Sequence, residues 1–502
     1  MGVRLWADSF GERHPVLRRI VMYGASRGVT EGLLAFRGIV LATFLGPAAF
    51  GAWSLFRLAG RYLGLGALGV HRGVEFEIVR ARTLAGDEAA PEADRMGETA
   101  LGFFLLMFGI VALIAFGASL FLRDPGLALG LRVLALGVLA EQLGIYVSVS
   151  LRARGELRRF AVSEVVSAAL QLVFGAGLAI AFGLTGAYLG FLIASVLSVS
   201  LFARRVPFHP RWSPGRLQSL IRFGFPMALL LLVTLVLGSV DRVVVVAFGG
   251  TALLGQYAFA AALAALAGTG SWVVRTIVFP GVYREATGKG SKMAIRYHLR
   301  QSLMPFSVVL PPLLGVAGIL IGPIIAQLLP QYQMAVAPAR MFLFTGIATG
   351  LANLATVAVL AVEQHRWVPA WAAASVLVNI GLAIGALTGG LGLLGVAGGA
   401  LLSQTLYSGA ILHIMAKAGG YESSVRVLFA ILGPTLWCAG ILALIQYLTP
   451  MTSPATSLLG LLAFLVLSVP LWSRLRKLGR RIRWKGRHPR SPVAARQEIP
   501  GP

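Results

Sequence analysis

Residues 223–248 read FGFPMALLLLVTLVLGSVDRVVVVAF, and only two of their side chains, Asp241 and Arg242, are charged. A run of about 20 mostly apolar residues is long enough to cross a bilayer as a helix. The whole chain has the same character, because only 13% of its 502 residues are charged and its mean hydropathy is +0.80. Soluble domains carry roughly 25% charged residues. The sequence therefore predicts an integral membrane protein.

By the same length criterion the chain contains about fourteen apolar spans. They cover residues 20–45, 49–71, 99–122, 127–151, 160–182, 184–203, 223–248, 252–283, 302–329, 336–362, 367–389, 391–416, 427–449 and 455–473. The spans are rich in Leu, Ala and Val and lack the period-2 alternation of a transmembrane barrel. We therefore expect an all-α polytopic membrane protein.

Positive charge is distributed unevenly between the loops. With the N-terminus inside, the inner segments hold 35 of the 44 Lys and Arg residues, and the outer loops hold only Arg123 and Arg340. This is the positive-inside pattern, so we expect both termini in the cytoplasm. The formal charge of +25 then sets topology and contacts anionic membrane lipids. No basic groove interleaved with aromatic residues is present, so no nucleic-acid partner is expected.

Signals for other classes of function are missing from the sequence. Cys438 is the only cysteine and the seven histidines lack metal-ligand spacing, which excludes a disulfide framework and a Cys-based metal cluster. There is no P-loop, and loops of at most about 25 residues are too short for a catalytic domain. The first apolar run lacks a small-residue cleavage site, so no cleavable signal peptide is expected. We expect no enzyme activity, no metal and no cofactor.

Two short matches indicate an internal repeat. Residues 44–53, FLGPAAFGAW, align with 248–257, FGGTALLGQY, at an offset of 204. Residues 183–190, GLTGAYLG, align with 392–399, GLLGVAGG, at an offset of 209. Each repeat contains six spans, so we expect two lobes in the same orientation, related by a pseudo-twofold axis along the membrane normal. The predicted lobes cover 1–205 and 206–420, followed by two further helices over 421–476 and a basic tail over 477–502.

Ionisable side chains inside the spans are the candidate functional residues. A charge at the bilayer centre costs about 2.5–3.5 kcal/mol and usually faces a cavity or a partner. Arg27 and Glu31 are one helical turn apart and can pair, whereas Arg57 and Arg61 place two like charges on one face. Because arginine holds phosphate oxygens bidentately, we expect a cationic cavity for a phosphate or diphosphate group. The alternative is pairing within the membrane and snorkelling to the interface.

Further charges lie in other spans. Arg275 is near the inner end of the eighth span, and Glu141 is the deepest lone acid, near the middle of the fourth. Asp241 and Arg37 occupy equivalent positions of the two repeats, at the offset of 204. Their opposite charges could meet near the axis and close an outer gate. The alternative is a local bond of Asp241 within the second lobe, although the adjacent Arg242 points about 100° away on a helix.

Several of these segments resemble one known family. The residues concerned are FGFP at 223–226, SVDR at 239–242, FGG at 248–250, GQY at 255–257 and Pro280, together with FLGP at 44–47 and Phe50-Gly51. They are similar to the Wzx-type polysaccharide and O-antigen flippases, the polysaccharide transporters of the multidrug/oligosaccharidyl-lipid/polysaccharide exporter superfamily. The resemblance covers nearly the whole chain.

The resemblance implies a flippase that moves an oligosaccharide linked to undecaprenyl diphosphate across the bacterial inner membrane by alternating access. The oligosaccharide would be a repeat unit of capsule, exopolysaccharide or the O-antigen of lipopolysaccharide. The resemblance also implies coupling to a proton or sodium gradient, and a polysaccharide polymerase and glycosyltransferases as partners in polysaccharide biosynthesis. Carried onto this chain, the substrate-binding residues are Arg27, Arg57, Arg61 and Arg275. The candidates for gating or ion coupling are Glu31, Arg37, Glu141, Asp241 and Arg242.

Three other functions are compatible with the same sequence features. A lipid II flippase or a multidrug exporter of the same superfamily would share the architecture. A scaffold within a polysaccharide assembly complex would need the helices but not the intramembrane charges.

Overall fold

The computed structural model describes residues 15–85, 90–123, 125–263, 291–362, 366–448, 454–471 and 473. Over these residues the chain forms helices and no β-strand, which confirms the all-α prediction. Ten of the described helices are long and apolar enough to cross a membrane. The two longest, Ser26–Ala67 and Leu157–Ala203, each fold back at a glycine and therefore contain two spans. The predicted eighth span, 252–283, is described only as far as Leu263.

The first half of the chain forms one group of helices. They are α2 (Pro15–Leu63), the 3₁₀ turn η1 (Gly64–Ala67), α3 (Val70–Ala85), α4 (Ala90–Ser119), α5 (Pro125–Ala153), α6 (Leu157–Leu170), the π-helical turn η3 (Gln171–Ala176) and α7 (Gly177–Ala203). Proline begins α2 and α5, where a helix does not need the missing N–H. We call this group the first lobe.

The second half contains α8 (Pro214–Leu237) and a helix over Val240–Leu263. After these come α10 (Ser291–His298), η4 (Leu299–Leu303), α11 (Met304–Leu328), η5 (Pro330–Ala335), α12 (Val336–Ala361), α13 (Val368–Thr388), α14 (Gly392–Ala418), α15 (Ser424–Leu448) and α16 (Pro454–Leu467). We call the Val240–Leu263 helix and α10–α14 the second lobe. The last two helices, α15 and α16, pack on α11.

The chain reverses at glycines that lie at the predicted repeat offsets. Gly46 in α2 and its equivalent Gly250 both have φ near 69°, and Gly183 in α7 and its equivalent Gly392 have φ of 60° and 57°. Only glycine adopts this left-handed region readily. Arg37 before the first reversal lies over the ring of Trp53 after it, so the two arms of α2 run side by side. Shared backbone geometry at both offsets supports the internal repeat.

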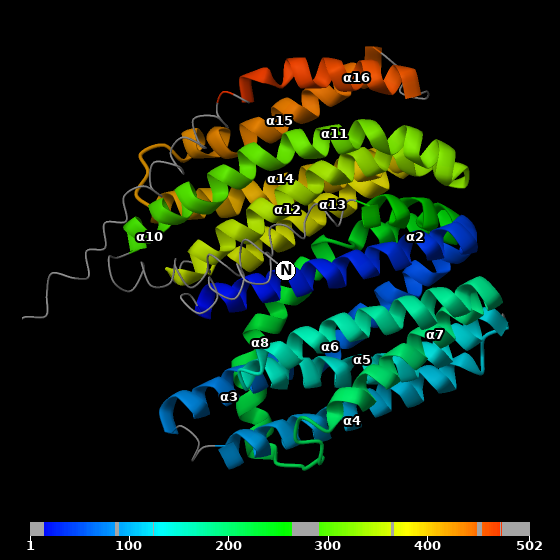
Figure 1. Ribbon diagram of the computed structural model, residues 1–502, viewed down its shortest axis with the longest axis vertical. Coiled ribbons are helices and arrows are strands. Elements are labelled where there is room, and N and C mark those ends of the chain that lie inside the picture. The colour runs from blue at the N-terminus through cyan, green and yellow to red at the C-terminus, as the bar shows by residue number, and fades with distance from the viewer. Residues whose placement is uncertain are drawn as a thin grey trace, which may run out of the picture.

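Figure 1 shows α3 to α7 on one side of α2 and α10 to α16 on the other. Helix α8 passes between the two lobes. Its first half packs on α3 and α4, with Gly224 against the backbone of Gly69. Its last turn packs on α13, where Nδ2 of Asn379 donates to the carbonyl of Leu237 at 3.4 Å. Helix α8 therefore contacts both lobes.

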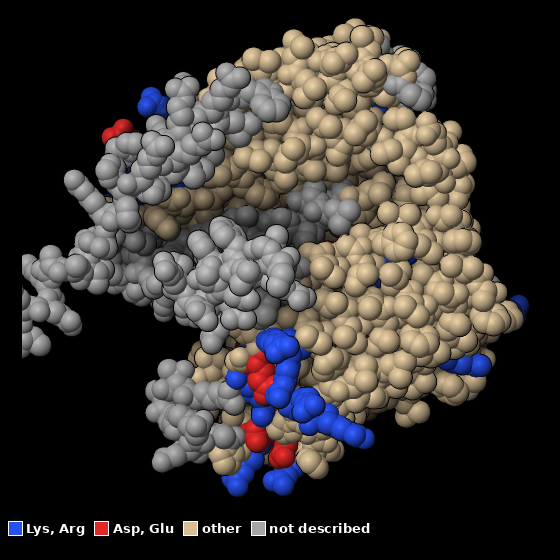
Figure 2. Space-filling view, in the orientation of Figure 1, with Lys and Arg blue, Asp and Glu red and all other residues tan. Residues whose placement is uncertain are grey.

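One end of the first lobe is charged, whereas most of the visible face is not. Figure 2 shows the Lys, Arg, Asp and Glu side chains of this lobe gathered mainly at the end that holds α3 and the start of α4. We call this the inner end, and the end at Gly46 the outer end. The uncharged surface between them suits contact with lipid tails, because exposed charges there are costly.

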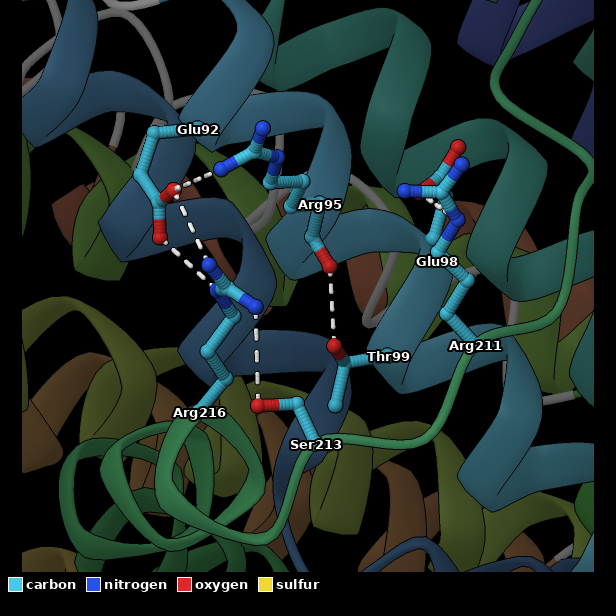
Figure 3. A network of polar contacts seen from close by, with 7 residues as sticks. All are labelled: Glu92, Arg95, Glu98, Thr99, Arg211, Ser213 and Arg216. Carbon is cyan, nitrogen blue, oxygen red and sulfur yellow. Dashed lines mark hydrogen bonds and ion pairs between the residues drawn. The ribbon is translucent and has the colours of Figure 1, made fainter.

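The segment 204–213, which connects α7 to α8, is fastened to α4 at the inner end (Figure 3). Arg216 Nε lies 2.8 Å from Glu92 Oε1, and Arg211 Nε lies 3.2 Å from Glu98 Oε2. The backbone N–H of Arg211 also donates to the carbonyl of Glu98 at 3.1 Å. These contacts tie the start of α8 to the first lobe.

Two expectations about individual spans are wrong. The run 223–248 is not one helix, because it breaks at Gly238-Ser239 between α8 and the Val240–Leu263 helix. Arg340 does not lie in an outer loop. It lies within α12, is 4% exposed, and its Nε donates to the carbonyl of Gly318 at 2.8 Å. The predicted tail, 477–502, lies outside the described residues.

Candidate functional site

Two connected cavities lie between the lobes. The larger, about 820 Å³, is lined mainly by the first lobe and by α8. The smaller, about 470 Å³, lies between α2 and the Val240–Leu263 helix. Leu34, Arg61, Glu141 and Gln171 line both cavities, so the two meet at these side chains. Three of these four residues are polar or charged, which makes the junction the candidate binding site.

Arg57 does not face this junction as a free cation. Its Nη2 lies 3.0 Å from Oε1 of Glu141, and its Nη1 lies 3.3 Å from Oε2. The guanidinium also lies 4.3 Å from the ring centroid of Phe191. The two side chains join α2 to α5, and each neutralises the other. The prediction that Arg57 and Arg61 form one like-charged face is therefore only half right, because Glu141 compensates Arg57.

Arg27 is held between two carboxylates. Its Nη2 lies 2.5 Å from Oε1 of Glu31, the partner expected one turn away, and its Nη1 lies 3.1 Å from Oε2 of Glu164 on α6. Ser148 donates to the other oxygen of Glu164 at 3.4 Å. One arginine and two glutamates leave a local excess of one negative charge.

Arg37 and Asp241 have separate partners, so the predicted gate between them is not formed. Arg37 donates to Oε1 of Gln171, the first residue of the π-helical turn η3. Asp241 is 2% exposed and accepts hydrogen bonds from the hydroxyl of Tyr257 at 2.7 Å and from the backbone N–H of Arg242 at 2.9 Å. The structure thus shows the local alternative.

The break in the predicted span explains this bonding. Because the helix restarts at Val240, Asp241 lies in a first turn, whose backbone N–H groups have no partner within the helix. The reversal at Gly250 then brings Tyr257 back beside it. Asp241 stabilises the start of this helix and its hairpin instead of reaching the other lobe.

Arg61 and Arg242 form no ion pair with any acidic side chain of the described residues. In the part of the chain that the structure describes, no ion pair or hydrogen bond engages the Arg61 side chain, which is exposed where the cavities meet. Arg242 lines the smaller cavity, and its Nε is buried without a hydrogen-bond partner among the described residues. One of these cations comes from the first lobe and one from the second.

The lining carries a net positive charge on a mainly apolar surface. Among the described residues, its charged members are seven arginines, 27, 37, 57, 61, 72, 152 and 242, and three glutamates, 31, 141 and 164. Hydroxyl and amide groups complete it, among them Thr30, Ser148, Ser163, Ser167, Ser195, Thr234, Thr349 and Asn353. This lining favours an anionic ligand that also carries many hydrogen-bonding groups.

The family described as "Polysaccharide biosynthesis protein" matches residues 40–337 of this chain. The chain belongs to this family. Its resemblance to polysaccharide flippases is thereby confirmed at the level of the family. A search of curated proteins by sequence found no match.

Several solved structures of flippases and transporters share the fold of this chain. The lipid II flippase MurJ in an inward closed conformation superposes with a TM-score of 0.66 and 17% identity, over 91% of this chain and 99% of that chain. An inward-facing multidrug resistance MATE family transporter superposes with a TM-score of 0.59 and 16% identity, over 84% of this chain and 99% of that chain. An outward-facing MATE family transporter superposes with a TM-score of 0.58 and 16% identity, over 86% of this chain and 96% of that chain. These comparisons show a multi-pass membrane fold.

Sequence reasoning missed two polar residues at the site. Glu164 lies in the predicted span 160–182 and could have been found by the rule that applied to Glu141. Gln171 is uncharged, so no charge signal marks it. Its place in a π-helical turn, a feature frequent at functional sites, is visible only in the structure. Arg275 lies outside the described residues.

Proposed function

We propose that this protein translocates an oligosaccharide linked to undecaprenyl diphosphate across the bacterial inner membrane by alternating access. The observation that carries the proposal is the pair of uncompensated cations, Arg61 and Arg242, in a cavity between two lobes. In the proposed orientation both termini and the inner end face the cytoplasm, which agrees with the positive charge of the inner loops.

The charge of the site matches that of a diphosphate diester. Such a group carries two negative charges, and Arg61 and Arg242 supply two positive charges that no carboxylate of the described residues holds in an ion pair, although Glu31 and Glu141 line the same cavity. Arginine binds phosphate oxygens in pairs, and inside a membrane protein these bonds replace hydration that the phosphate loses. The hydroxyl and amide groups of the larger cavity would bind sugar hydroxyls. Arg27, Arg37 and Arg57, which have partners, hold the helices in place around the ligand.

Coupling to a cation gradient belongs to the same proposal. Arg27, Glu31 and Glu164 form a cluster with one excess negative charge, a place where a proton or a sodium ion would be bound. Loading and release of that cation would reset the lobes after each transport step. Glycosyltransferases would make the substrate at the inner face, and a polysaccharide polymerase would use it at the outer face.

The test is complementation of a bacterial strain that lacks its polysaccharide flippase. Arg61→Gln and Arg242→Gln should each lower polysaccharide export, because losing a charge-assisted bond weakens binding by ~10- to 100-fold. The double variant should abolish export, and its protein level should stay normal because neither side chain holds an acidic partner. Arg159→Gln, at an exposed position paired with Glu156, is the control. Full export by the double variant would reject the proposal.

A lipid II flippase is the second candidate function, since lipid II also carries a diphosphate and the fold matches that of MurJ over 99% of its chain. Rescue of a peptidoglycan defect, without rescue of a polysaccharide defect, would favour it. Export of cationic drugs is opposed by seven arginines against three glutamates in the described lining. A scaffold would tolerate removal of Arg61 and Arg242.

A further inference from the structure

The inner end of the larger cavity holds a second basic cluster. Arg72 on α3 and Arg152 on α5 both line this cavity. Glu141 at the cavity junction and Arg152 at the inner end are eleven residues apart on one helix, or about 16 Å at 1.5 Å per residue. A diphosphate bridges only a few ångströms, so it cannot contact both clusters at once.

Both arginines of this cluster hold one carboxylate. Arg152 binds Glu75 with a two-pronged fork, Nε to Oε1 at 2.8 Å and Nη2 to Oε2 at 2.9 Å. Arg72 adds a third bond from Nη1 to Oε2 at 2.9 Å. Burial raises the pKa of Glu75, but the bonds and charges of Arg152 and Arg72 outweigh it and hold that pKa below its ordinary value. The ionised cluster has two positive charges and one negative charge.

The arrangement leaves room for a phosphate. The Arg72 side chain is 50% exposed and uses only Nη1 on Glu75. The first turn of α3 opens on the same cavity, because Gly69, which precedes it with φ 78°, is part of the lining. Bidentate arginine contacts of the kind made to Glu75 are also those made to phosphate.

His71 lies beside this cluster. It lines the cavity beside Arg72, and its Nε2 lies 2.9 Å from Oε1 of Gln142. Since an amide oxygen only accepts, Nε2 carries the proton and Nδ1 is an acceptor. Nδ1 is buried without a hydrogen-bond partner among the described residues.

We propose that Arg72 and Arg152 form a second binding site, which takes the diphosphate of the lipid-linked oligosaccharide at the inner mouth before it reaches Arg61 and Arg242. This inference rests on the proposed function. While the site is empty, Glu75 binds the guanidinium groups of Arg72 and Arg152. When the substrate binds, its phosphate oxygens replace the Glu75 carboxylate. The hydroxyls of Thr30, Ser148 and Ser163 line the cavity through which the sugar then moves.

Binding of undecaprenyl diphosphate to the purified protein in lipid nanodiscs tests the inner site. The starting protein is the double variant Arg61→Gln/Arg242→Gln. Adding Arg72→Gln to it should raise the dissociation constant of the remaining binding ~10-fold or more, which is the cost of losing one charge-assisted bond. Glu75→Gln should strengthen it, because both forks become free. Arg80→Gln, also on α3 and half-exposed but outside the cavity lining, is the matched control and should change nothing. An unchanged dissociation constant on Arg72→Gln would overturn the proposal.

Two further measurements separate this site from its rivals. Phosphatidylglycerol at equal concentration should not displace undecaprenyl diphosphate; equal competition would assign the arginines to bulk lipid headgroups and overturn the proposal. Thermal unfolding of each variant separates a binding effect from a folding effect, and Arg72→Gln should unfold like the wild type because this side chain is half-exposed. If Arg72→Gln weakens binding while Arg61→Gln/Arg242→Gln still exports polysaccharide, the site at Arg72 and Arg152 is supported and the proposed role of Arg61 and Arg242 is rejected.

Discussion

At the residue scale, the role of each intramembrane arginine depends on its partner. Arg57 and Arg61 are one turn apart on α2, yet Glu141 neutralises Arg57 and no carboxylate neutralises Arg61 in the described chain. The Arg57–Glu141 pair is shielded from water, with side chains 19% and 29% exposed. In such a pair each partner avoids the cost of a lone buried charge. Arg57 should therefore matter for stability and Arg61 for binding.

A double-mutant cycle at Arg57 and Glu141 checks this distinction. Arg57→Gln should lower the free energy of unfolding by about 1.5–3 kcal/mol, the worth of a hydrogen-bonded charge pair, because Glu141 loses its counter-charge. Arg57→Gln/Glu141→Gln should recover most of the loss, whereas Arg61→Gln should cost little. Thermal unfolding in detergent compares the four proteins of the cycle, which are the wild type, Arg57→Gln, Glu141→Gln and the double variant, with Arg61→Gln as a fifth. No recovery in the double variant would contradict a stabilising pair.

At the element scale, glycines decide where helices reverse and how closely they pack. In α7, Gly190 packs on the carbonyl of Phe174 beyond the reversal at Gly183, and a Cβ at Gly190 would clash with that oxygen. Its equivalent Gly399 packs on Leu382 of α13, where a Cβ would lie 2.8 Å from the Leu382 Cβ. Both hairpins thus place a glycine at a close helix contact, 209 residues apart.

Gly190→Ala should destabilise the first of these hairpins. The clash is with backbone, which cannot rotate away, so an overpacking cost of about 1–3 kcal/mol is expected. Gly177→Ala in the same helix is the control, because no atom lies within 4 Å of a Cβ there and its φ is helical. Thermal unfolding and membrane protein level give the comparison. Equal unfolding temperatures and protein levels for Gly190→Ala and Gly177→Ala would mean that the close contact of Gly190 with Phe174 is not needed for stability.

At the scale of the whole molecule, the lobes meet at the outer end through a symmetric contact. A Cβ on Gly51 would clash with the carbonyl of Thr251, and one on Gly255 would clash with the carbonyl of Pro47. These four residues form two pairs related by the offset of 204, so each lobe presents the same surface to the other. At the inner end, the contacts of Figure 3 fasten α8 to the first lobe. The two lobes are therefore in direct contact at the outer end.

Gly51→Ala should loosen this outer contact and expose the smaller cavity to the outside. Ala258, which is buried and lines that cavity, can be replaced by cysteine and labelled with a membrane-impermeant maleimide in whole cells. Labelling should be faster in Gly51→Ala than in the parent. Gly38→Ala, where no atom lies within 4 Å of a Cβ, should leave the rate unchanged. The single native thiol, Cys438, is buried and adds little background. Equal labelling of Gly51→Ala and the parent would place the outer gate elsewhere.

The sequence by itself determined the membrane class, most of the helix positions and the glycines at the repeat offsets, because a bilayer demands long apolar runs and reversals demand glycine. It also marked most of the charges that line the cavities, since a charge inside a span is rare. Only the tertiary structure decided which charges cancel. Arg57 and Glu141 are 84 residues apart and Arg27 and Glu164 are 137 apart, so no local pattern joins them. The same holds for Asp241, whose partner Tyr257 reaches it only because the helix breaks at Gly238-Ser239 and the chain turns back at Gly250.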